Sequence, residues 1–201
     1  MKKLGLIICL FPFLNGEAQQ DFVIEVNDTT LNIALNKNYN IVLKGQKINF
    51  KVTSKDTLNY DDAFFSFLYH KDLKVSRTEL KTGIEQITIV TAEGSGILIQ
   101  KFSTFDPGQL KDLLLSEVTK ESISYGYEAK RFDYRRILGS GENIAVMKSV
   151  LRYKDAVSIY ELASFSKKDA GLIIMTIRRD ENDNTAGKKV IDLMWNSIKL
   201  K

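Results

Sequence analysis

One stretch of the chain concentrates basic and aromatic side chains, residues 130–136 with the sequence KRFDYRR. Successive side chains of a β-strand point to opposite faces. One face would carry Lys130, Phe132, Tyr134 and Arg136. The other would carry Arg131, Asp133 and Arg135. Arginine beside aromatic rings is typical of binding surfaces, because a guanidinium stacks on rings and pairs with acidic groups through two hydrogen bonds.

We therefore predict a binding surface on this strand, with Arg152 contributed by the next strand along the chain. Two other interpretations stay open. The charges could keep an exposed sheet face in solution. They could also protect an edge strand from pairing with other chains.

Histidine and cysteine chemistry is nearly absent from the sequence. Catalysis by a Ser-His-Asp or Cys-His arrangement needs an imidazole, and the only histidine is His70, followed by the turn-like pair Lys71-Asp72. The only cysteine is Cys9. A zinc site needs three or four ligands, usually cysteine and histidine. We predict a protein that is not an enzyme and that binds neither a metal nor a cofactor.

Carboxylates offer two weaker possibilities. Residues 180–185, DENDNT, place oxygen ligands at the first, third and fifth positions of a calcium loop. However, Thr185 stands where the loop needs glycine and Ile191 where it needs glutamate,. We expect a solvated loop, with its acids favourably placed before a helix. Paired carboxylates can also hydrolyse glycosides, so a ligand-binding or hydrolytic protein with a carboxylate-lined pocket remains the alternative.

The N-terminal residues indicate export. Lys2 and Lys3 precede an apolar run over residues 4–14, and Gly16-Glu17-Ala18 places small residues before a cleavage site after Ala18,. The run is shorter than the roughly 20 residues that span a bilayer. We therefore expect a signal peptide over residues 1–18, and a periplasmic or extracellular protein without a transmembrane segment. Removal of the signal peptide takes away Cys9, the only cysteine, so no disulfide is expected.

The net charge of +4, from 29 basic and 25 acidic residues, is too mild to predict nucleic-acid binding,.

Period-two apolar spacing predicts two or three short strands within residues 21–52, while the polar residues 56–62 are predicted to form a loop. A hairpin is predicted over residues 84–103, with a four-stranded meander over residues 127–179. Asp106 is expected to cap a helix whose stripe is Leu110, Leu113, Leu114 and Val118. A terminal helix is expected to bury Val190, Ile191, Met194, Trp195 and Ile198.

This order of elements predicts an α+β fold, a mainly antiparallel sheet covered by two amphipathic helices, preceded by an N-terminal β-hairpin segment. Residues 64–69, FFSFLY, are followed by the turn and strand of KDLKV. Together with the element order, these residues make the chain from about residue 60 to 201 similar to the PsbP-like superfamily, which includes PsbP, DcrB and their relatives. The resemblance implies an α/β/α sandwich over residues 59–201, after an extension over residues 19–58, and a role in binding proteins.

Three functions follow as hypotheses. The first is an exported, non-enzymatic binding or scaffold domain that contacts an envelope or extracellular protein through its sheet or its N-terminal hairpin. The second is the small ligand-binding or hydrolytic protein. The third is adhesion to an acidic surface through the arginine-rich strand, which would weaken with salt.

Overall fold

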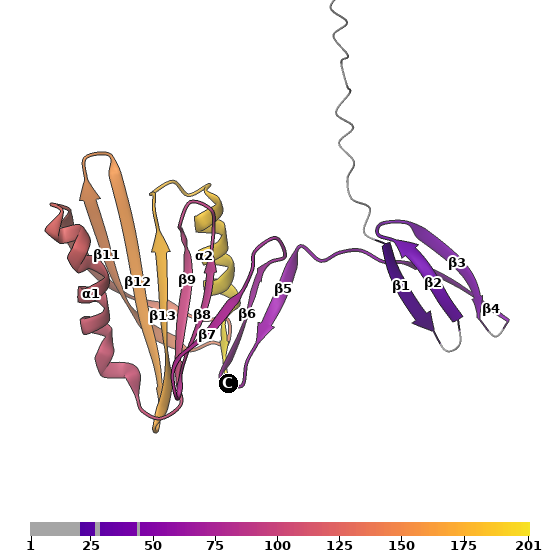
Figure 1. The fold of residues 1–201 in the computed structure, drawn as a ribbon, viewed down its shortest axis with the longest axis horizontal. Coiled ribbons are helices and arrows are strands. Elements are labelled where there is room, and N and C mark those ends of the chain that lie inside the picture. The colour runs from indigo at the N-terminus through magenta and orange to yellow at the C-terminus, as the bar shows by residue number, and fades with distance from the viewer. Residues whose placement is uncertain (1–20, 27–28, 44) are drawn as a thin grey trace, which may run out of the picture. The chain divides into compact units, whose positions relative to one another are not determined.

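A computed structural model describes residues 21–26, 29–43 and 45–201 (Figure 1). The predicted signal peptide and its cleavage site lie outside these residues. The chain divides into two compact units, Met1–Lys55 and Asp56–Lys201, whereas the sequence placed the boundary between residues 58 and 59. Neither helix in the described part of the chain has the length and apolarity needed to cross a bilayer.

The N-terminal unit contains two β-hairpins. Strand β1 (Asp21–Val26) pairs with β2 (Thr29–Ala34), and β3 (Asn38–Leu43) pairs with β4 (Gln46–Lys51). Ile33 and Ala34 are buried, and the backbone amide of Ala34 donates to the Tyr39 hydroxyl at 2.6 Å. Gly45 takes a positive φ of 79° in the β3–β4 turn, as its position predicts,. The described residues of this unit form four strands, where the sequence predicted two or three.

The C-terminal unit is built on a seven-stranded antiparallel sheet (Figure 1). Its strands run in the order β10 (Glu128–Ile137), β11 (Asn143–Tyr153), β12 (Ala156–Lys167), β13 (Ala170–Arg178), β9 (Gly96–Phe102), β8 (Ile84–Val90) and β7 (Ser76–Lys81). The predicted β8–β9 hairpin and the four-stranded meander are both confirmed.

A smaller sheet joins β5 (Thr57–Asp61), β6 (Phe65–His70) and β14 (Lys199–Leu200). The prediction of a loop over residues 56–62 is wrong, because β5 pairs with β6 along its whole length. Its Tyr60 stacks on the rings of Phe65 and Phe67. One inward aromatic residue is enough to place this mainly polar strand against the core. His70 ends β6, and its carbonyl accepts from the Leu73 amide in the expected turn.

Both predicted helices form. Asp106 accepts a hydrogen bond from the Gly108 amide at 2.8 Å, and a 3₁₀ turn, η1 (Pro107–Leu110), leads into α1 (Lys111–Ser124). Leu113 is 57% exposed, so its place in the predicted stripe is wrong; Leu115 is buried instead. The predicted apolar positions of the terminal helix, including Trp195, are all buried; Ile198 directly follows the end of α2 (Ala186–Ser197) and the others lie within it.

The predicted α/β/α sandwich, with a sheet covered by two helices, is wrong. Strands hold 55% of the described residues and helices 17%, so the unit is mostly antiparallel sheet. The physical reason is size. Seven strands span about 29 Å at the usual spacing, whereas a helix with its side chains is about 10 Å wide. Helix α2 contacts β6, β9 and β13, and α1 contacts η1, β11 and β12. Neither helix extends over a whole face.

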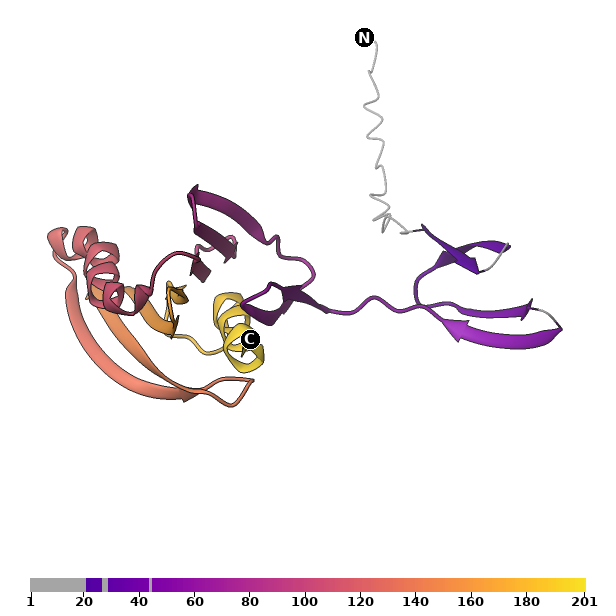
Figure 2. The same ribbon diagram turned by 90° about the horizontal axis from the view of Figure 1, so that it is seen from below.

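The sheet has an apolar layer on each side. Trp195, Met194 and Ile174 belong to the layer under α2, while Leu115, Leu151 and Leu162 belong to the layer under α1. Figure 2 shows β10 and β11 curving around the side on which α2 (gold) lies. Because α2 stops short of these strands, the sheet keeps an uncovered, curved surface there.

Candidate functional site

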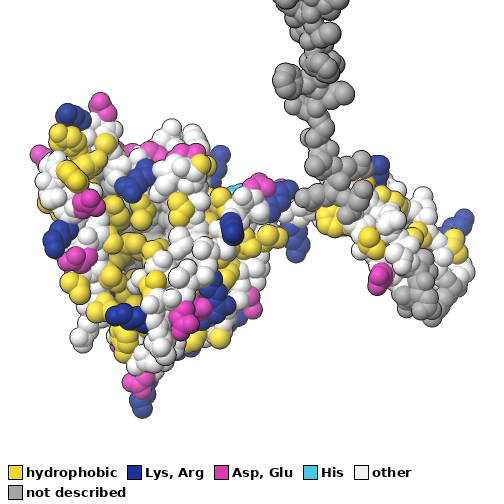
Figure 3. All heavy atoms as spheres, in the orientation of Figure 1, with side chains coloured by type: hydrophobic (Ala, Val, Ile, Leu, Met, Phe, Trp, Pro, Cys, Tyr) yellow, Lys and Arg dark blue, Asp and Glu magenta, His cyan; other side chains and the backbone are white. Residues whose placement is uncertain are grey.

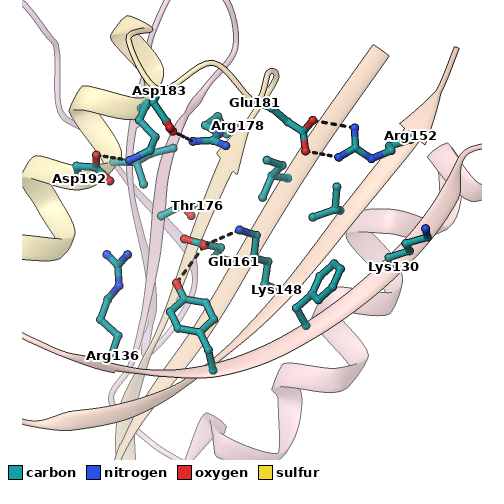
Figure 4. A pocket seen from close by; sticks show the side chains of 16 residues that line it. Lys130, Arg136, Lys148, Arg152, Glu161, Thr176, Arg178, Glu181, Asp183 and Asp192 are labelled. Atoms are coloured by element: carbon teal, nitrogen blue, oxygen red, sulfur yellow. Dashed lines mark hydrogen bonds and ion pairs between the residues drawn. The ribbon is translucent and has the colours of Figure 1, made fainter. Parts of the chain in front are cut away.

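The uncovered surface beside α2 forms a groove of about 790 Å³ (Figure 4). Its walls and floor come from β10, β11, β12, β13, the loop after β13 and the first turns of α2. The lining residues are Lys130, Phe132, Tyr134, Arg136, Lys148, Val150, Arg152, Ile159, Glu161, Thr176, Arg178, Glu181, Asp183, Lys188, Ile191 and Asp192. This volume lies in the range of ordinary ligand pockets.

Strand β10 divides the predicted binding residues between two faces. Lys130, Phe132, Tyr134 and Arg136 line the groove. Arg131 and Arg135 do not. Arg131 contacts Asp112 of α1 at 2.7 Å and Asp133 at 2.9 Å, and these hydrogen bonds raise the pKa of the guanidinium. Arg135 donates to the Asn143 side chain at 3.0 Å. Arg131 and Arg135 are therefore bound by their own neighbours and do not contribute to the groove.

Arg152, the predicted residue of the next strand, lies at the groove rim. Its guanidinium pairs with the carboxylate of Glu181 through both oxygens, with Nη1 2.8 Å from one of them (Figure 4). This hydrogen bonding lowers the pKa of Glu181. The pair connects β11 to the loop after β13 and so shapes the rim. Part of the hydrogen-bonding capacity of Arg152 is used by Glu181.

Glu161 lies in the centre of the floor. It accepts a hydrogen bond from the Tyr134 hydroxyl at 3.0 Å, and the Lys148 ammonium is 3.9 Å away (Figure 4). Burial, followed by the charge of Glu161, raises the pKa of Tyr134 to about 12. Tyr134 therefore stays protonated at neutral pH and donates to Glu161.

The other acidic side chains of the lining also have basic partners. Asp183 lies 3.6 Å from Arg178, and Asp192 lies 2.5 Å from Lys188. With Glu161 and Glu181, all four carboxylates are engaged. Hydrolysis by a carboxylate pair needs one proton-donating acid and one free carboxylate. The arrangement argues against that chemistry. Among the described residues, no group of three or more histidine, cysteine, aspartate or glutamate side chains is placed to hold a metal ion.

Two cations of the lining have no ion-pair partner among the described residues, Lys130 and Arg136. The Cζ atom of Arg136 lies 5.0 Å from the ring centroid of Trp195 and 5.9 Å from that of Tyr134. Its Nη1 is buried without a hydrogen-bond acceptor. Stacking on the two rings therefore holds the guanidinium in place at the groove lining.

Sequence reasoning missed the floor and the far wall of the groove. Lys148, Glu161 and Arg178 sit on strands that otherwise read as apolar, and a charged side chain within a buried strand is the signal that was available for them,. No such signal existed for the residues of the loop and α2, because only the folded chain brings them opposite β10.

Comparisons with known proteins give little further. No protein-family model matches the sequence, and no curated protein matches it. Among solved structures, the chain is similar to cyanobacterial PsbP from Synechocystis sp. PCC 6803, with 12% sequence identity and a TM-score of 0.48. The match covers 73% of this chain and 93% of that one. The similarity of fold is distant.

Proposed function

We propose that this chain is an exported, non-enzymatic binding module that holds a protein partner in the groove beside β10. The observation that carries the proposal is Arg136, a guanidinium fixed over Trp195 with its Nη1 buried and without an acceptor. A buried donor without a partner costs stability, and an anionic group bound in the groove would supply the missing acceptor.

Three properties of the groove support binding over catalysis. Its carboxylates are engaged in hydrogen bonds and ion pairs. Aromatic Phe132 and Tyr134 stand between two available cations, the composition in which binding anchors are enriched,. The lining also carries charges of both signs, six basic and four acidic. Figure 3 shows the same mixture of signs on the face it presents, unlike the strong single-sign field that adhesion to an acidic surface would use,.

Export is supported by the N-terminal sequence, in which Lys2 and Lys3, an apolar run and Gly16-Glu17-Ala18 follow one another,. The partner would then be a protein of the envelope or of the extracellular space.

Site-specific photocrosslinking tests the proposal. Phe132 lines the groove and is 53% exposed, whereas Ile137 is 71% exposed and does not line it. A photoreactive phenylalanine at position 132, in the cells that make the protein, is expected to give a discrete protein adduct. The same residue at position 137 is the matched control. Adducts from position 137 alone, or from neither position, would refute the groove as a partner site.

A further inference from the structure

We infer that the groove takes an extended acidic segment of a protein, with two acidic side chains six residues apart. This inference rests on the proposed function and specifies the chemistry of the partner.

The spacing of the two available cations gives the length of the segment. Lys130 and Arg136 lie on the same face of β10, six residues apart. At the rise of a β-strand this is about 20 Å. One small organic acid does not bridge such a distance. An extended peptide does, because its side chains on one face repeat with the same period as those of β10. Two acidic residues at positions 1 and 7 would then each meet a cation.

The side chains between the two cations define the middle of the segment. Phe132 shares the groove lining with the buried Val150 and Ile159, so position 3 should be apolar. Tyr134 already donates to Glu161, and that carboxylate would repel an acid. Position 5 should therefore be a neutral or donor side chain such as serine, threonine or asparagine. The expected pattern is acidic, apolar, polar and acidic at alternate positions, counted from the Lys130 end.

The charges of the lining also disfavour other polyanions. A nucleic acid or an acidic polysaccharide carries negative charge at every repeat. It would bring some of that charge against Glu161, Glu181 and Asp183, which face the groove. A peptide can place its acids at the two cations alone.

A random heptapeptide library displayed on phage, selected on the purified protein, tests the pattern. We expect enrichment of acidic residues at positions 1 and 7 with an apolar residue near one end. Selection on Arg136→Glu should exchange the acidic preference at one end for a basic one and leave the other end acidic. Arg135→Glu, on the opposite face of the same strand, is the matched control and should leave the pattern unchanged. A role of Arg136 in folding alone would not produce this exchange at one position.

Titration with the selected peptide, synthesised with a fluorescent label, measures how much Arg136 contributes to affinity. Arg136→Gln should raise the dissociation constant of this peptide about tenfold or more, equivalent to about 1.4 kcal/mol. Arg135→Gln should raise it less than about twofold, since exposed charges contribute little. No enrichment, acids at another spacing, or an unchanged pattern on Arg136→Glu would each overturn the inference. If position 132 still crosslinks a protein in that case, the proposed function stands and only the acidic segment falls. An adduct at position 132 with a polysaccharide or a lipid would refute both.

Discussion

The guanidinium of Arg136 lies over the indole ring of Trp195, with Cζ 5.0 Å from the ring centroid. Trp195 is fully buried in the layer under α2, so the arginine is anchored on the part of the unit least able to move. Its position is fixed before any partner arrives, which lowers the conformational entropy lost on binding. This relationship links the core to the groove.

Arg136→Met tests whether this arrangement serves binding at the expense of stability. Methionine keeps an unbranched stem over Trp195 and removes a buried donor that lacks an acceptor. We expect the free energy of unfolding to rise by roughly 1 kcal/mol, measured by urea denaturation. Lys130→Met, an exposed change on the same strand, should shift it by less than about 0.5 kcal/mol. A loss of 1 kcal/mol or more in Arg136→Met would instead make the stacking on Trp195 a structural contact.

The raised pKa of Tyr134 predicts that the protein loses stability at high pH. Its folded pKa of about 12 lies above the ordinary value of 10.0. The stabilisation is therefore complete below pH 10 and disappears as the pH rises from 10 to 12, because the unfolded chain loses the proton first. Urea unfolding across this range should show a steeper fall for the native chain than for Tyr134→Phe. Identical pH profiles for the two proteins would contradict the part-buried hydrogen bond between Tyr134 and Glu161.

Among the charged residues of the C-terminal unit, Lys101 of β9 should be the one whose replacement lowers stability the most. Its ammonium lies 2.8 Å from Asp62 and 2.7 Å from Glu85, and all three side chains are mostly buried. Lys101→Met leaves the buried carboxylate of Asp62 without its cation, while Glu85 keeps its pair with Arg77; removing one partner of a buried ion pair typically costs about 3–5 kcal/mol. Lys71→Met, which breaks the exposed pair with Asp56, should cost less than about 1 kcal/mol. Equal melting temperatures for the two variants would contradict this account.

Gly187 sets how closely α2 approaches the sheet. A Cβ atom there would lie 2.3 Å from the Cβ of Ser95, which is buried in the β8–β9 connection. Gly187→Ala should therefore destabilise the protein by about 1–3 kcal/mol, although alanine favours a helix by about 1 kcal/mol. Asn196→Ala, on the exposed side of the same helix, should be neutral or slightly stabilising. A more stable Gly187→Ala in thermal denaturation would show that α2 has room to move outward.

Local patterns gave most of the strands and both helices, because each depends on neighbours in the sequence. The Asp106 cap, the β8–β9 hairpin and the buried face around Trp195 are examples. The coverage of the sheet was not predictable in this way. It depends on how many strands join one sheet and on which of them α2 contacts, and the same long-range packing decides that a groove remains.

The candidate site shows the same division. Alternation along β10 indicates which side chains share a face, but not which face is open. Arg131 finds Asp112 on α1, nineteen residues away in sequence, and Arg136 finds Trp195 on α2. Neither contact has a signal in the local sequence. Arg131 and Arg136 are equivalent as residue types and differ only in their surroundings.

The most direct test of the account reverses charge on one face of β10 at a time. Lys130→Glu with Arg136→Glu changes the groove, and Arg131→Glu with Arg135→Glu changes the opposite face. Both double variants keep the same change in net charge, and circular dichroism confirms folding. Binding to the partner captured at position 132 should be abolished by the groove pair and retained by the opposite pair. Equal loss in both, or loss only with Arg131 and Arg135, would contradict the groove as the binding site.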